Sequence, residues 1–150
     1  LKTSIADALA NKVDLAPRLA QRPLAHSRAR AFDVAPDGSL SNNRVFATMY
    51  SAEDGVPDGM KVDTASRVYC TGAAGCWVFD ASGAHLGTIK QPEVTANCAW
   101  GGPDNRTMFF TARTSVYTLR MTTPGTAGAS RELVEHHISF VVSVSTHIFK

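Results

Sequence analysis

The sequence predicts an all-β fold built from a repeated four-stranded antiparallel meander. The first observation is a series of short apolar segments separated by turn residues, at 60–63, 68–71, 76–80 and 85–89. The second is an echo of this series about forty residues further on, at 96–100, 108–111 and 115–119. A period of roughly 40 residues with four strands in each period indicates a β-propeller, in which every period forms one blade.

The strand pattern also divides the chain into three regions. Residues 31–124 are predicted to form about two to three blades, the first of which contains the hairpin turn Pro36-Asp37-Gly38. Residues 1–30 are expected to be an irregular or helical lead-in. Residues 125–150 are expected to be a C-terminal tail with a strand over 138–145, which either adds to an exposed sheet edge or forms an aggregation-prone segment.

Composition limits the classes of partner. The chain has 150 residues, 44% of them hydrophobic, which is enough for one core but too little for six blades of roughly 40 residues. A net charge of +2 is too small to predict a nucleic acid or an anionic membrane as partner. No apolar run reaches the length of a membrane span, and no secretory signal is visible, so a cytoplasmic location is expected.

The three cysteines, Cys70, Cys76 and Cys98, form an odd set without CxxC spacing. They lie among large apolar residues, and we interpret them as buried reduced thiols.

Two residues are candidates for chemistry, Asp58 and Asn97. Asp58 belongs to a Pro-Asp-Gly turn that precedes the innermost strand of a blade, and Asn97 is expected at the matching place in the next blade. Such oxygen-bearing side chains would converge near one mouth of the channel, as a hard divalent cation requires. The alternative is that both residues only cap turns through local hydrogen bonds.

Six motifs follow one another along the chain: AFDVAPDGSLSNNR (31–44), DGMKVD (58–63), WVFD (77–80), HLGTI (85–89), NCAWGG (97–102) and FTA (110–112). In this order they resemble the gluconolactonase family, which includes regucalcin (senescence marker protein). The resemblance covers about residues 29–124.

The resemblance implies a six-bladed propeller that holds one divalent ion, calcium or zinc, with magnesium as a third candidate, and that hydrolyses sugar lactones. It implies that Asp58 is a metal ligand and orients or deprotonates the attacking water, while the metal polarises the lactone carbonyl. It places Asn97 beside the substrate. The family's other ligands, a glutamate near the start of the full-length chain and an asparagine in the blade before Ala31, have no counterpart in this sequence.

Two hypotheses follow from this partial match. In the first, the chain is a lactonase whose site is completed by association, for example a homodimer of three-bladed halves that closes one ring. In the second, it is a truncated, non-catalytic propeller fragment that binds a partner through open sheet edges or has no function.

Overall fold

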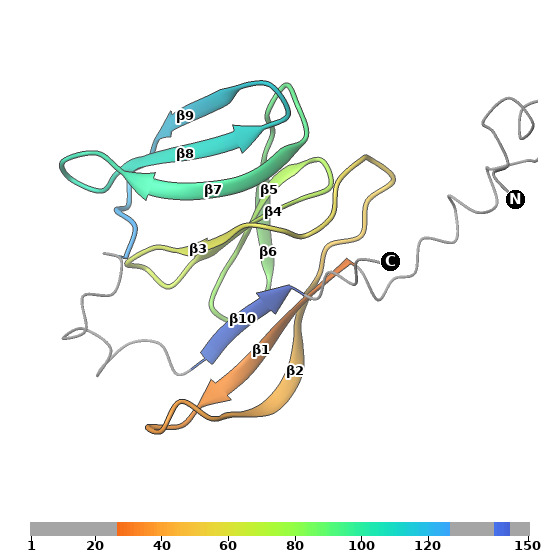
Figure 1. Ribbon diagram of the computed structural model, residues 1–150, viewed down its shortest axis with the longest axis vertical. Helices are drawn as coiled ribbons and strands as arrows, with labels where there is room; N and C mark the ends of the chain where they lie inside the picture. The colour runs from red at the N-terminus through yellow and green to blue at the C-terminus, as the bar shows by residue number, and fades with distance from the viewer. Residues whose placement is uncertain (1–26, 127–139, 145–150) are drawn as a thin grey trace, which may run out of the picture.

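The computed structural model describes residues 27–126 and 140–144, and these residues form three antiparallel sheets (Figure 1). The first sheet has the order β10-β1-β2, with β10 at Phe140–Val144, β1 at Arg28–Val34 and β2 at Leu40–Thr48. The second has the order β3-β4-β5-β6, with strands at Met60–Val62, Val68–Gly72, Gly75–Phe79 and His85–Ile89. The third has the order β7-β8-β9, with strands at Thr95–Gly101, Thr107–Ala112 and Val116–Arg120.

The predicted all-β meander is confirmed, and the described residues contain no α-helix. The second sheet is the complete four-stranded unit in simple sequential order, as one propeller blade requires. Pro36-Asp37-Gly38 forms the turn between β1 and β2, where the Asp37 carboxylate accepts a hydrogen bond from the Ser39 N–H at 2.9 Å. The chain is therefore part of a β-propeller.

The first strand begins earlier than predicted. β1 begins at Arg28, inside the predicted lead-in. It is tied to β2 by the Asp33 carboxylate, which accepts hydrogen bonds from Asn42 at 2.9 Å and from Arg44 at 2.7 Å. The remainder of the lead-in lies outside the described residues.

The strand predicted in the C-terminal tail is present as β10. It pairs antiparallel with β1, so the tail adds to a sheet edge, one of the two outcomes expected from its sequence. The rest of the predicted tail beyond Thr126 lies outside the described residues.

The second sheet lies between the other two and is covered on both faces (Figure 1). All five residues of β4 are buried, and its side chains alternate between the two cores because successive residues of a strand point to opposite faces. Val68 and Cys70 pack toward the first sheet with Ala29, Ala47, Met49 and Phe79. Tyr69 packs toward the third sheet with Cys76, Cys98, Met108 and Phe110.

The cysteines have the buried positions that their apolar neighbours predicted. Cys70, Cys76 and Cys98 are free thiols, and each is at most 2% exposed. Burial raises the pKa of Cys70 to about 12, because the thiolate would lose its hydration. These side chains therefore behave as small apolar core residues.

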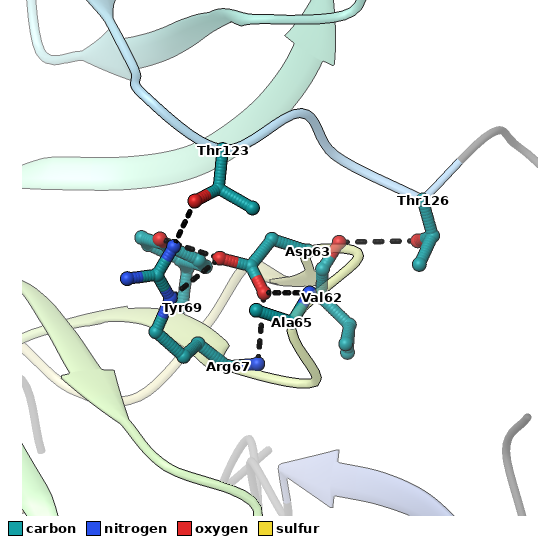
Figure 2. A network of polar contacts seen from close by, with 7 residues as sticks. All are labelled: Val62, Asp63, Ala65, Arg67, Tyr69, Thr123 and Thr126. Carbon is teal, nitrogen blue, oxygen red and sulfur yellow. Dashed lines mark hydrogen bonds and ion pairs between the residues drawn. The ribbon is translucent and has the colours of Figure 1, made fainter.

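A buried carboxylate joins the second sheet to the chain that follows the third (Figure 2). Asp63 is 1% exposed and accepts hydrogen bonds from the N–H groups of Ala65 and Arg67 at 2.9 Å each. It also accepts one from the Arg67 guanidinium at 2.7 Å and one from the Tyr69 hydroxyl at 3.0 Å. Burial, followed by this bond to Asp63, raises the pKa of Tyr69 to about 12.

Residues 121–126, which follow β9, return to this network. The Arg67 guanidinium also donates to the Thr123 hydroxyl. The Thr64 N–H donates to the Pro124 carbonyl at 3.0 Å, and the Thr126 N–H donates to the Val62 carbonyl at 3.1 Å. The end of β3 is thus held against residues that follow the third sheet.

Replacing Asp63 by alanine is expected to lower the free energy of unfolding by about 3 kcal/mol, because the Arg67 and Tyr69 donors would lose a buried acceptor. Denaturant titration measures this loss. The matched control is Asp80→Ala, because Asp80 receives a similar set of bonds from Ser82 and Ala84 in an exposed turn. Equal losses for the two variants would contradict a special role for the buried network.

The Glu93 carboxylate is expected to make the stability of the protein depend on pH in the acid range. Glu93 accepts hydrogen bonds from Thr114, Ser115 and Tyr117. These bonds, first of all the one from the Thr114 N–H, lower the pKa of Glu93 from 4.5 to about 2. A lowered folded-state pKa adds stability that is present above pH 4.5 and is lost as the pH falls toward 2. We expect Glu93→Gln to lower the thermal midpoint at neutral pH and to make it less sensitive to acid. Parallel acid profiles for the two proteins would refute this.

Candidate functional site

The Asp58 side chain is exposed on a loop whose backbone is fixed. Asp58 lies in the connection between β2 and β3, with buried residues Pro57 and Gly59 on either side of it. Its N–H donates to the carbonyl of Thr71 in β4 at 3.0 Å. The carboxylate is therefore open to solvent while its backbone is held in place. A group that reacts with a dissolved substrate needs both properties.

Asn97 belongs to β7 and lies directly against the residue that follows Asp58. A Cβ atom placed on Gly59 would come within 2.1 Å of the Asn97 amide oxygen and 2.7 Å of its Cα. Only glycine permits this approach of the two backbones. The structure therefore brings the neighbourhoods of Asp58 and Asn97 together, while the chemical roles assigned to these two residues stay predictions.

The hydroxyl of Thr71 joins the two inner strands at this point. Thr71 is fully buried in β4. Its hydroxyl accepts a hydrogen bond from the Gly59 N–H at 2.8 Å and donates one to the Ala96 carbonyl at 2.8 Å. The Gly59 N–H also reaches the Ala96 carbonyl at 3.2 Å. Sequence reasoning missed this residue, although a threonine ending an otherwise apolar strand segment was a visible signal.

The predicted equivalence of Asp58 and Asn97 is wrong by one position. Asn97 pairs with Thr111 in β8, and the corresponding residue of the second sheet, Thr71, donates its N–H to the Gly59 carbonyl at 2.9 Å. Asn97 therefore matches Gly59 in register, not Asp58.

A groove of about 330 Å³ adjoins Asn97 and is lined by residues of the third sheet together with Lys61 of β3. Its lining residues are Lys61, Asn97, Cys98, Ala99, Phe109 and Thr111. Phe109 is 38% exposed, whereas its neighbours Met108 and Phe110 point into the core. The groove thus combines an apolar wall with amide, hydroxyl and ammonium groups, a mixture suited to a polar organic ligand.

The described residues do not by themselves complete a site for a divalent cation. Asp58 and Asn97 offer side-chain oxygens, but the Asn97 oxygen already accepts a hydrogen bond from the Cys98 N–H at 2.8 Å. Within residues 27–126 and 140–144, no group of three or more His, Cys, Asp or Glu side chains is placed to hold a metal ion. Calcium takes six to eight oxygen ligands, so further ligands are required.

Comparison with known families agrees with this geometry. Residues 25–114 match the family described as SMP-30/Gluconolactonase/LRE-like region. The chain belongs to this family. The resemblance seen in the sequence motifs is thereby confirmed.

Individual relatives extend the comparison. The chain is 32% identical over 97 residues to lactonohydrolase oryH of Aspergillus oryzae, an alignment that covers 65% of this chain and 20% of the relative. A solved gluconolactonase from Xanthomonas campestris is 33% identical with a TM-score of 0.52, over 63% of this chain and 30% of that one. A luciferin-regenerating enzyme shares the fold with a TM-score of 0.61 at 21% identity, over 69% of this chain and 41% of that one.

A further match concerns a different kind of protein. A stretch of 46 aligned residues is 69% identical to the bifunctional uridylyltransferase/uridylyl-removing enzyme of Novosphingobium aromaticivorans. It covers 28% of this chain and 5% of that enzyme, which is too small a part to carry its activity over. The chain also spans only about a fifth of the lactonohydrolase and less than a third of the Xanthomonas gluconolactonase.

The close contact at Gly59 can be tested directly. We expect Gly59→Ala to lower the free energy of unfolding by about 1 to 3 kcal/mol, because the new methyl group would overlap Asn97. Thermal or denaturant unfolding measures the change. Adding Asn97→Ala should recover only part of the loss, since the overlap with the Asn97 backbone would persist. A fully stable Gly59→Ala protein would show that these strands do not meet as described.

Proposed function

We propose that this chain contributes the Asp58 half of an active site that hydrolyses sugar lactones. The observation that carries the proposal is the exposed Asp58 carboxylate on a fixed backbone, next to Gly59, which contacts the groove residue Asn97. Membership of the family, together with the lactonohydrolase and gluconolactonase relatives, supports a lactone as the substrate class.

Asp58 is suited to act as a general base. Its carboxylate would accept a proton from a water molecule while the water oxygen forms a bond to the lactone carbonyl carbon. The ring C–O bond then breaks, and the proton passes to the departing ring oxygen. One water is added in total and the product is a hydroxy acid, which ionises and releases a proton.

Asn97 is suited to bind the substrate. Its amide oxygen accepts a hydrogen bond from the Cys98 N–H, which fixes the orientation of the amide group. The NH₂ group then has two donors to offer to a sugar hydroxyl or to the lactone carbonyl. In this role Asn97 binds and orients, while the proton transfer belongs to Asp58.

The divalent ion predicted from the family resemblance is a separate part of the proposal. Because the described residues supply too few ligands, calcium, zinc or magnesium would bind only if additional oxygen donors came from elsewhere. A second copy of the chain that closes the ring is one source of such ligands. Metal binding and dimerisation are therefore expected to occur together.

A non-catalytic binding module is the second candidate function. Two features of residues 27–126 favour it: the ligand set is incomplete, and the third sheet has three described strands where the second has four. Its last strand, β9, carries Val116 and Leu119 at 63% and 41% exposure. An edge strand of this kind is suited to pairing with a strand of another protein.

Hydrolysis of gluconolactone, followed by base uptake at constant pH, separates the two functions. We expect turnover by the purified protein and a loss of about a hundredfold or more in kcat for Asp58→Asn, as for removal of a general base. Asp54→Asn is the matched control, because Asp54 is another exposed carboxylate of the same connection. Each protein is assayed after chelation and after addition of calcium, zinc or magnesium, with its mass measured by sedimentation.

No turnover by folded protein in any of these conditions would reject the hydrolase and leave the binding module. Equal activity of Asp58→Asn and the wild type would reject Asp58 as the base. A thermal midpoint that stays constant as metal is added would reject the cation site, because a ligand that binds the folded state must raise it.

A further inference from the structure

Lys61 places a positive charge in the groove that adjoins Asn97. It lies in β3 opposite Tyr69 of β4, so its side chain is on the face directed toward the third sheet. It is partly buried and lines the same groove as Asn97. Its ammonium group donates a hydrogen bond to the carbonyl of Met60 at 2.9 Å.

The ammonium group of Lys61 has no carboxylate partner among the described residues. The ion pairs within residues 27–126 involve Arg44, Arg67, Lys90 and Arg120 instead. The charge of Lys61 affects a neighbouring residue of the groove, Cys98. It contributes to lowering the pKa of Cys98, after the larger effect of a hydrogen bond with Cys76. An unpaired cation in a concave, partly apolar site attracts an anionic group of a ligand.

Lys61 is connected to Asn97 both along the chain and across the groove. It is two residues beyond Gly59, which touches Asn97. Lys61 and Asn97 also line the same groove, so one sugar-sized molecule in the groove can contact both side chains.

The opposite wall of the groove is suited to the body of a sugar. The ring of Phe109 lies against Gly101, where an added Cβ would come within 2.9 Å of the ring. This contact holds an apolar surface in the groove, and the hydroxyl of Thr111 lies beside it as a hydrogen-bonding group. A sugar offers both C–H surface and hydroxyl groups to such a pair of side chains.

We propose that the groove selects a lactone that carries an additional anionic group, a carboxylate or a phosphate, which pairs with the Lys61 ammonium while the sugar lies beside Asn97. The proposal rests on the proposed hydrolase function and specifies its substrate class. A lysine ammonium serves either anion as a point charge, and the attraction is strong in a site that is partly shielded from water.

The test compares three lactones in the same pH-stat assay: neutral gluconolactone, glucarolactone with a free carboxylate, and phosphogluconolactone with a phosphate. We expect Lys61→Met to lower kcat/KM about tenfold or more for an anionic lactone and less than about twofold for the neutral one. Lys61→Arg should retain most of the preference. The control is Lys90→Met, because Lys90 is exposed and pairs with Glu53.

Several outcomes decide the proposal. If Lys61→Met loses only the preference for glucarolactone, the anionic group that Lys61 recognises is a carboxylate. If it loses only the preference for phosphogluconolactone, that group is a phosphate. A wild-type protein with no preference for either anion would overturn the proposal, as would an equal decrease for all three lactones in Lys61→Met. Thermal unfolding of each variant checks that its fold is intact.

A binding measurement separates this proposal from the proposed hydrolase function. Calorimetry with glucarate and phosphogluconate, the open-chain products, requires no turnover. If no lactone is hydrolysed but one of these anions binds about tenfold more weakly to Lys61→Met, the hydrolase fails and the anion site stands. If gluconolactone is hydrolysed but neither anion binds better than neutral glucose, the anion site fails and the hydrolase stands.

Discussion

Burial of the second sheet on both faces is the constraint on which the rest of the structure depends. Its strand β4 has no exposed residue, so one sheet must cover each face. Because side chains of a strand alternate, the same five residues serve two cores at once. Thr71, at the end of this strand, has no access to water, and its hydroxyl must be satisfied within the protein. It is satisfied by Gly59 and Ala96, which sets the two inner strands side by side.

Both ends of β3 are consequently tied to other parts of the chain. At its start, Gly59 contacts Asn97 and bonds to the Ala96 carbonyl. At its end, the carbonyl of Val62 accepts a hydrogen bond from Thr126, and Asp63 is held by a buried network. A short strand fixed in this way can present Asp58 and Lys61 at constant positions. Preorganised groups of this kind are what catalysis and selective binding need.

The proposed chemistry divides between groups that are present and groups that would have to be supplied. The described residues place an amide and a cation, Asn97 and Lys61, in one groove, and the exposed Asp58 carboxylate precedes Gly59, which contacts Asn97. They do not contain the several oxygen ligands that a divalent ion requires. The chain also corresponds to only a part of its matched relatives. Experiments must therefore distinguish two alternatives. In one, the chain assembles with further metal ligands and hydrolyses a lactone. In the other, the groove only binds a ligand.

The sequence by itself determined the strands, the repeated meander, the turn at Asp37 and the buried cysteines, because local periodicity and turn chemistry decide these features. It also predicted that Asp58 and Asn97 lie near one another, although the spacing of the repeats placed them one position out of register. The tertiary structure alone decided the register of Asn97, the contacts of Thr71 and the position of Lys61 in the groove. Each of these depends on how two sheets meet, and a shift of one residue in a strand leaves no mark in the local pattern.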